Sequence, residues 1–196
     1  METDKQSAAN ILKRYMRYLK LERNHSDNTI EAYRHDLLML LDFLKEHDLQ
    51  PTAVKLEDLQ QFAVTLHEKG VVAKSQARIL CGVRAFYRFL LLDGYIDADP
   101  SELLESPKLP FHIPEYLTLE EVDQLEASFD MSKPESQRNR AIIEVLFSCG
   151  LRVSELVNLK LSDLYLEEKF VRVIGKGNKE RLVAISDKAI HELELW

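Results

Sequence analysis

The sequence predicts a mainly α-helical protein with a small β-hairpin or sheet, divided into two domains. Apolar residues recur at helical spacing through most of the first hundred residues. Four prolines between Asp99 and Pro114 then exclude a continuous helix. From Phe170 onward, apolar residues alternate with a period of two around a glycine-rich turn, which is typical of a hairpin.

Four helices are expected in the first domain, and their short connections favour a helical bundle. The second helix opens with Asn28 as its predicted N-cap, and Glu31 completes a capping box three residues later. Gly70 ends the third helix, and the fourth stops before Asp93 and Gly94. These helices are predicted at about residues 8–19, 28–47, 56–68 and 74–92.

The second domain combines helices with the hairpin. Thr118 and Glu121 form a capping box at the start of its first helix. A helix over residues 138–148 carries apolar residues that we expect to be buried, Ile142 and Phe147 among them. Further elements are expected at residues 153–159, 170–174 and 181–185, and from Ser186 or Asp187 onward. The predicted boundaries are 1–105 for the helical domain, 106–117 for a proline-rich linker and 118–196 for the second domain.

Composition excludes several classes of protein. A chain with 45% hydrophobic and 30% charged residues is typical of a globular protein and not of a disordered one. Apolar runs such as Phe89–Leu92 are too short to cross a membrane, and the N-terminus has no signal-peptide core. The two cysteines lack the spacing of a metal site and a disulfide-rich context, so we expect a reduced, cytoplasmic protein without a bound metal.

The fourth predicted helix is strongly basic, although the chain has a net charge of −7. Residues 69–92 contain five cations and no acidic residue. Four of the cations fall within an arc of about 120° when each residue turns the helix by about 100°. These four cations are Lys74, Arg78, Arg84 and Arg88. Such a face either lies against a phosphate backbone or is simply solvated.

The start of the second helix adds polar side chains that would suit a nucleic acid. Helix N-termini favour phosphates, and side chains there can reach base edges in a major groove. The candidates for this contact are Asn28, Thr29, Tyr33, Arg34 and His35. Helix capping explains Asn28 equally well.

A second basic feature is Arg152, which follows Gly150 at the start of a short predicted helix. A cation at a helix start opposes the helix dipole, so this position calls for a compensating partner. Glu155 is one turn away, and two explanations are open. In the first, Glu155 and Arg152 form an ion pair that only stabilises the fold. In the second, Glu155 orients the guanidinium of Arg152 so that it can bind a phosphate in a bidentate manner.

The hairpin supports the second of these explanations. Lys176 lies between Gly175 and Gly177, where the backbone can approach a ligand closely. Lysines at hairpin tips usually serve solubility alone. Together with Arg152 and a basic helix in another domain, however, Lys176 is most simply explained by a phosphodiester ligand.

These segments resemble the tyrosine recombinases of the phage integrase family, and most closely the Xer-type recombinases. GLRVSEL is similar to the motif of the first catalytic arginine, and VIGKGNKER to the hairpin of the catalytic lysine. NTIEAYRHDL and RAFYRFL resemble the N-terminal core-binding domain, and LTLEEVDQL the start of the catalytic domain. The resemblance implies a four-helix SAM-like core-binding domain followed by part of a mixed α/β catalytic domain.

The resemblance also implies functional roles. Arg152 would bind the scissile phosphate and stabilise its transition-state charge. Glu155 would support Arg152, and Lys176 would protonate the departing 5′ oxygen. Covalent 3′-phosphotyrosine chemistry requires no cofactor. The expected partners are a double-stranded DNA recombination site and further recombinase protomers, in a homo- or heterotetramer on the DNA.

The sequence departs from the family after Lys176. The family motif His-x-x-Arg is not matched at His191, because Glu194 stands three residues later, and the last tyrosine in the sequence is Tyr165. We therefore expect an incomplete catalytic domain that does not cleave DNA by itself and that exposes apolar surface, with self-association or a loosely folded C-terminal part.

Three functions stay open at this point. The first is a site-specific recombinase represented by an incomplete chain. The second is a truncated module that binds DNA without cutting it, or that regulates a full-length recombinase. The third is an unrelated helical interaction protein whose basic helix is solvated.

Overall fold

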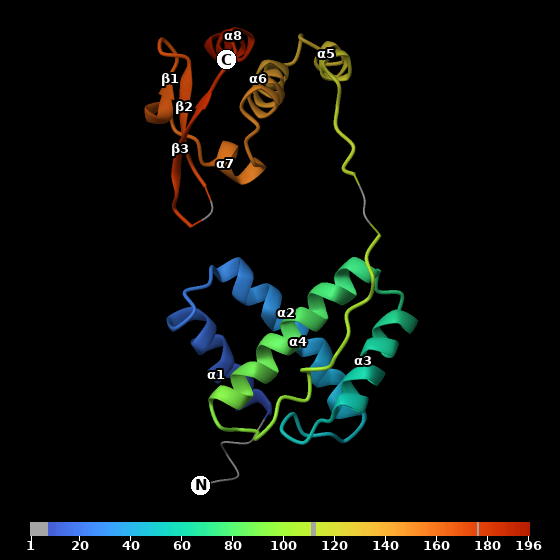
Figure 1. The fold of residues 1–196 in the computed structure, drawn as a ribbon. Coiled ribbons are helices and arrows are strands. Elements are labelled where there is room, and N and C mark those ends of the chain that lie inside the picture. The colour runs from blue at the N-terminus through green and yellow to red at the C-terminus, as the bar shows by residue number, and fades with distance from the viewer. Residues whose placement is uncertain (1–7, 111–112, 176) are drawn as a thin grey trace. The chain divides into compact units, whose positions relative to one another are not determined.

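The computed structural model describes residues 8–110, 113–175 and 177–196. The chain divides into two compact units, Met1–His112 and Ile113–Trp196, and each folds around its own hydrophobic core. The described residues are mainly helical with one small antiparallel sheet, which confirms the predicted fold class (Figure 1). No described helix is both long enough and apolar enough to span a membrane.

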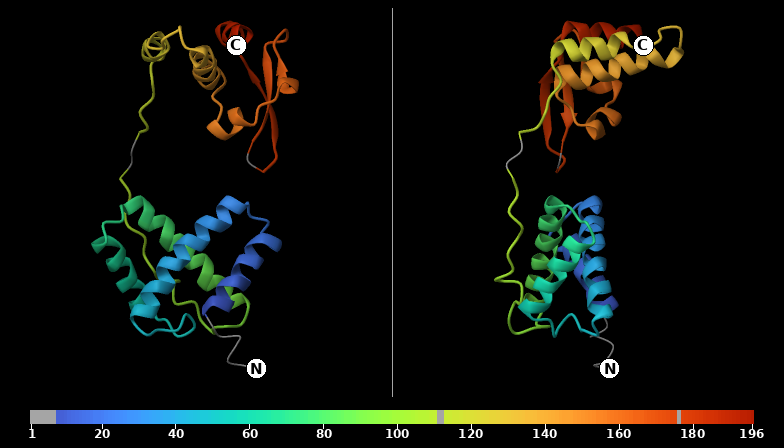
Figure 2. Two further views of the ribbon diagram at one scale, coloured as in Figure 1. Left: turned by 180° about the vertical axis from the view of Figure 1, so that it is seen from behind. Right: turned by 90° about the vertical axis from the view of Figure 1, so that its right-hand side faces the viewer.

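The described part of the first unit contains four α-helices, as the apolar spacing predicts. They are α1 (Ala8–Leu21), α2 (Asp27–Glu46), α3 (Leu56–Glu68) and α4 (Ala73–Leu92). Helix α2 packs against α1 and α4, and α3 packs against α4. Helices α2 and α4 cross each other (Figures 1 and 2). The predicted apolar face of α4 is buried at Ile79, Val83, Phe86 and Leu90.

The predicted N-cap of α2 is wrong. Ser26 caps the helix, and its hydroxyl accepts a hydrogen bond from the backbone N–H of Thr29 at 3.3 Å. Residues 26–28 are all good capping residues, so sequence preference alone does not select one of them. Glu31 forms no capping box and instead pairs with Arg34 at 3.1 Å.

The described part of the second unit combines four α-helices with a 3₁₀ turn and three short strands. Within its described residues these are α5 (Leu119–Ala127), α6 (Pro134–Cys149), α7 (Val153–Val157), a 3₁₀ turn (Leu161–Asp163), β1 (Leu164–Tyr165), β2 (Phe170–Ile174), β3 (Glu180–Ala184) and α8 (Asp187–Leu195). The described strands pair antiparallel in the order β1-β2-β3. Strand β1 was not predicted, because two residues are too few to show an alternating pattern.

Helices α6 and α8 pack together beside the sheet (Figure 2). The core of this unit joins Val145 and Cys149 of α6 with Ala189 of α8 and with Val171 and Val173 of β2. Two layers, helices and sheet, therefore enclose the core.

The helix caps of the second unit confirm two predictions and revise the extent of two helices. Thr118 and Glu121 form the predicted capping box, and Ser186 caps α8. Helix α6 starts at Pro134, earlier than predicted, because proline suits the first helical turn. Helix α7 ends at Val157, two residues earlier than predicted.

The expected burial along α6 is wrong at two positions. Ile142 is 36% exposed and Phe147 is 45% exposed, whereas Val145 is 1% exposed. The side of the helix that carries Ala141, Val145 and Cys149 is buried, and Leu146 packs against the core from a partly buried position. A single apolar side is typical of a helix that packs on one neighbouring layer.

Candidate nucleic-acid interface

Arg152 lies between α6 and α7. Gly150 ends α6 in the left-handed conformation, with φ of 57°, a region that favours glycine. The backbone N–H of Arg152 donates to Oε2 of Glu155 at 2.9 Å, and Nη1 donates to Oε1 at 2.9 Å. The pair expected from the sequence is present, and the carboxylate holds both the backbone and the side chain of Arg152.

Glu155 also binds a second arginine that the sequence did not suggest. Arg181 of β3 donates from Nη1 to Oε1 and from Nη2 to Oε2, both at 2.9 Å. Hydrogen bonds from Arg181 and from the backbone and side chain of Arg152 lower the pKa of Glu155 to about 2. The carboxylate is therefore ionised at neutral pH. Arg181 and Glu155 are 26 residues apart, so no local sequence pattern predicts their contact.

The two members of the predicted pair differ in exposure. The Glu155 side chain is 4% exposed, whereas the Arg152 side chain is 69% exposed. Within the described residues, Nε and Nη2 of Arg152 have no hydrogen-bond partner. Arg152 is thus anchored at one end and keeps most of its donors available for an external anion.

A cavity of 570 Å³ opens beside Arg152. Its cationic lining consists of Arg152, Lys160 and Arg172, and Gly175 also lines it. Arg172 is paired with the buried Asp163, and its Nη2 lies 2.6 Å from Oδ1. Lys176, the predicted general acid, lies outside the described residues. Its neighbour Gly175 shares the cavity with Arg152, and the role of Lys176 stays a prediction.

The four cations on α4 differ in their surroundings. Lys74 and Arg88 are exposed, and within the described residues neither has an ion-pair partner. Arg84 donates to the backbone oxygen of Leu104 at 2.9 Å and to the hydroxyl of Ser106 at 2.8 Å. Arg84 therefore also holds the segment that follows α4 in place through these two hydrogen bonds.

Arg78 has an acidic partner that lies outside the basic segment 69–92. Its Nη1 binds Oδ2 of Asp36, a buried carboxylate of α2 that is 42 residues away in the sequence. Burial raises the pKa of Asp36, and Arg78 opposes that shift. One function of Arg78 is thus to neutralise a buried charge.

The predicted residues of α2 lie close to this ion pair. Thr29 and Tyr33 line a pocket of 80 Å³ together with Arg78 and Cys81 of α4. Asn28 and Arg34 are exposed on α2. The structure thus brings Thr29 and Tyr33 together with Arg78 on one surface of the first unit.

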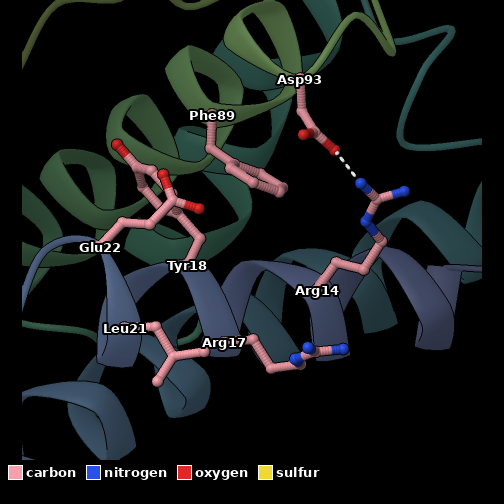
Figure 3. Close-up of a pocket in the computed structure, with 7 residues that line it drawn as sticks. All are labelled: Arg14, Arg17, Tyr18, Leu21, Glu22, Phe89 and Asp93. Carbon is pink, nitrogen blue, oxygen red and sulfur yellow. Dashed lines mark ion pairs between the residues drawn. The ribbon is translucent and has the colours of Figure 1, made fainter.

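Two further depressions contain none of the predicted site residues. A pocket of 440 Å³ between α1 and the end of α4 holds an Arg14–Asp93 ion pair of 2.9 Å (Figure 3). Its lining contains as many acidic as basic side chains and has no clear preference for an anion.

The second depression is an apolar groove of 540 Å³ in the second unit. Ile142, Val157 and Leu161 line it, and Leu161 is 87% exposed. The groove confirms the expected exposure of apolar surface, whereas self-association stays a prediction. Among the described residues, no group of three or more His, Cys, Asp or Glu side chains is placed to hold a metal ion.

Each of the two units matches a known protein family. Residues 12–94 match the phage integrase N-terminal SAM-like domain, and residues 115–196 match the phage integrase family. Together these two matches cover most of the chain.

Individual related proteins match this chain over almost its whole length. The chain is 40% identical over 190 residues to tyrosine recombinase XerD of Yersinia pestis, covering 97% of this chain and 64% of that protein. It is 41% identical over 186 residues to tyrosine recombinase XerD of Proteus mirabilis, covering 95% of this chain and 59% of that protein. The chain therefore spans less than two thirds of the length of these relatives.

Solved structures share the fold. A lambda integrase tetramer bound to a Holliday junction matches with a TM-score of 0.78 at 17% identity, covering 100% of this chain and 58% of that chain. The Tn1549 transposon integrase in complex with circular intermediate DNA matches with a TM-score of 0.68 at 22% identity, covering 94% of this chain and 63% of that chain. With both domain matches and relatives of about 40% identity, the chain belongs to the phage integrase family of tyrosine recombinases.

Proposed function

We propose that this chain acts in site-specific DNA recombination, in which a DNA strand is cleaved and rejoined through a 3′-phosphotyrosine. Residues 1–105 would bind the duplex, residues 118–196 would contribute part of the catalytic site, and residues 106–117 would connect them. The partners would be a double-stranded recombination site and further recombinase protomers. Both cysteines are free, which supports the proposal that the protein acts in the reducing cytoplasm.

The main support is the state of Arg152. Its guanidinium is fixed by the buried Glu155 yet remains largely open to solvent beside a cavity. A guanidinium held in this way presents several donors to a phosphate without having to be ordered on binding. Arg181 already pairs with both oxygens of Glu155, so the charge of this carboxylate does not by itself require Arg152. The geometry thus favours the phosphate-binding explanation over a purely structural pair.

The proposed chemistry divides the work between two side chains. In the complete active site a tyrosine oxygen attacks the phosphorus, and the bond from phosphorus to the 5′ oxygen breaks. Arg152 would stabilise the extra negative charge on the phosphoryl oxygens in the transition state. Lys176 would give its proton to the 5′ oxygen as that oxygen leaves. The ammonium and the guanidinium therefore act on different oxygens of one phosphate.

A polypeptide of residues 1–196 would bind DNA without cleaving it, because no tyrosine follows Tyr165 in this sequence. The alternative function for such a polypeptide is that of a DNA-binding module or of a regulator of a full-length recombinase. A suicide substrate, in which a nick traps the covalent intermediate, should yield no protein–DNA adduct. Formation of an adduct would refute this part of the proposal.

The duplex-binding face can be tested through its dependence on salt. Lys74→Ala combined with Arg88→Ala should lower the slope of log K against log salt by nearly 2, because each lost phosphate contact removes roughly 0.9. These two cations suit the test because neither is paired within the described residues. Lys55→Ala together with Lys69→Ala, on exposed residues that flank α3, is the matched control.

The outcomes of this titration separate the candidate functions. A control slope equal to that of the unmodified chain supports the face defined by α4. An equal fall in both double variants would show that the contact is not specific to this face. Failure of the unmodified chain to bind duplex DNA at low salt would favour the helical interaction protein.

A further inference from the structure

The carboxylate of Glu155 connects two elements that are separate in the sequence. Arg152 precedes α7, and Arg181 lies within β3, in register with Val173 of β2. Each carboxylate oxygen of Glu155 accepts one hydrogen bond from each arginine, all at 2.9 Å. A movement of Arg181 would therefore be transmitted to both contacts that hold Arg152.

The geometry of Arg181 is that of a rigid clamp. Its two terminal nitrogens bind the two oxygens of Glu155 in parallel, which fixes the plane of the carboxylate as well as its position. Its side chain is 39% exposed, against 69% for Arg152, so Arg181 is the more enclosed of the two arginines.

Gly175 shows how tightly this cluster is packed. A Cβ atom at this position would lie 3.0 Å from Nη1 of Arg181 and 3.2 Å from Oε1 of Glu155. The backbone of the predicted lysine hairpin thus passes directly over the ion pair. The backbone N–H of Gly175 also donates to the oxygen of Lys179 at 2.7 Å, which begins the turn.

We propose that Arg181 is a positioning residue for phosphate binding at Arg152. Through Glu155, it sets the orientation of the Arg152 guanidinium and holds it at a fixed distance from the strand that leads to Lys176. Arg181 itself contacts no phosphate in this proposal. The inference rests on the proposed function, since it requires that Arg152 binds a phosphate.

A simpler role for Arg181 would be to neutralise a buried carboxylate. Lysine would supply the same charge but only a point contact in place of the two parallel hydrogen bonds. Arg181→Lys therefore separates neutralisation from orientation. Gly175→Ala tests the same idea without changing a charge, because the new methyl group would displace the clamp.

The test is a double-mutant cycle on affinity for a labelled, mixed-sequence DNA duplex at fixed low salt. Arg152→Ala should weaken binding about tenfold, since a charge-assisted hydrogen bond contributes on the order of 1.4 kcal/mol or more. Arg181→Lys and Gly175→Ala should each weaken binding about threefold to tenfold in the presence of Arg152. In the Arg152→Ala background, both should lose most of that effect, because the residue through which they act is gone.

The matched control is Arg140→Gln. Arg140 pairs with Glu192, which is 4% exposed, at 2.7 Å, so this variant also breaks an arginine pair with a buried carboxylate in the same unit. Its effect on DNA affinity should be less than twofold in either background, which is the size of a minor coupling. A loss at Arg140→Gln equal to that at Arg181→Lys would overturn the inference by making the effect one of general stability.

A spectroscopic measurement gives a second, independent readout. In ¹⁵N spectra of arginine side chains, the Arg152 resonances should shift and broaden in Arg181→Lys and Gly175→Ala but not in Arg140→Gln. Unchanged Arg152 resonances would contradict the inference even if DNA binding were weakened.

The results distinguish a failure of the proposed phosphate role of Arg152 from a failure of the positioning role of Arg181. If Arg152→Ala leaves affinity unchanged, the phosphate role of Arg152 is wrong. If Arg152→Ala weakens binding while Arg181→Lys and Gly175→Ala cause equal losses in both backgrounds, or none in either, then Arg181 does not act through Arg152. In that case the proposed function stands and the positioning role does not. Gly175→Ala keeps the cycle decisive should Arg181→Lys fold poorly.

Discussion

The two units of this chain are stabilised in different ways. In the described part of the first unit, nineteen buried apolar residues form one cluster, and Tyr15 contacts Phe86 and Phe89 with ring centroids 5.3 and 5.1 Å apart. In the described part of the second unit the corresponding cluster has seven residues. Apolar burial of this kind supplies most of the free energy of folding, so the second unit has less of it.

Buried charge shows the opposite distribution. Among the described residues, the first unit buries one carboxylate, Asp36, and the second buries five. The five are Glu126, Glu144, Glu155, Asp163 and Glu192. Each lies close to lysine or arginine, because an unpaired buried charge is very costly.

Because of this difference, the candidate functional cations of the two units are held in position in different ways. In the second unit Arg152 belongs to the network of buried charges, so its position is fixed by the fold itself. In the first unit Lys74 and Arg88 lie on the surface of a helix whose apolar side already holds it in place. We conclude that Arg152 of the second unit is harder to replace without disturbing the fold than Lys74 and Arg88 of α4.

The largest expected effect is on the apolar core of the first unit. Phe62 is 2% exposed, and Phe62→Ala should lower the free energy of unfolding of this unit by about 3–5 kcal/mol through lost burial and a cavity. Hydrogen exchange resolved by residue would measure the effect separately for each unit. Val64→Ala, at a 47% exposed position on the same helix, should change it by less than about 0.5 kcal/mol. If Phe62→Ala lowered the free energy of unfolding equally in both units, the view that each unit is stabilised by its own core would be wrong.

The second expected effect is on the charge network of the second unit. Lys188 lies 2.8, 2.8 and 3.0 Å from Asp123, Glu126 and Glu144, and thereby joins α5, α6 and α8. Lys188→Met keeps the aliphatic stem and leaves two buried carboxylates without their cation. The second unit should lose about 2–3 kcal/mol, below the range for a fully buried pair, because Lys188 is partly open to solvent.

Lys169→Met is the control for this prediction. Lys169 pairs with Asp187 at 2.7 Å, but both side chains are exposed, so the loss should be under about 1 kcal/mol. Similar losses in the two lysine variants, measured by urea unfolding, would show that burial of the carboxylates does not matter.

The smallest expected effect is a difference in acid sensitivity. Arg181 and Arg152 lower the pKa of Glu155 to about 2, and Arg172 lowers the pKa of Asp163. A carboxylate with a lowered pKa stabilises the fold above its unfolded pKa, which is about 4, and this contribution disappears as the pH falls towards 2. Burial raises the pKa of Asp36 in the first unit, so protonation there favours the folded state instead.

The second unit should therefore unfold before the first as the pH is lowered from about 4.5 to 2. Burial raises the pKa of Glu126, which partly offsets this loss in the second unit. Glu155→Gln should flatten the pH dependence of the second unit in thermal melts. A profile that is as steep in this variant as in the unmodified chain would refute the assignment to Glu155.

Local patterns in the sequence predicted most of the fold and only part of the site. The apolar spacing of α1 to α4 and the Thr118 capping box depend on neighbours within a few residues. By contrast, the pairing of Arg78 with Asp36 and of Arg181 with Glu155 joins residues 42 and 26 positions apart. Such contacts arise from how the elements pack. The sequence therefore identified Arg152 as a candidate but not the clamp behind it.

The exposure of Cys81 has a practical consequence. Cys81 lies on the surface beside Thr29, Tyr33 and Arg78, whereas the other cysteine, Cys149, is buried. A thiol-reactive dye should therefore label the chain at a single place, at the edge of the surface expected to meet the duplex. The molecule carries its own attachment point for a fluorescent reporter, and the proposed docking on DNA can be tested without introducing a new residue.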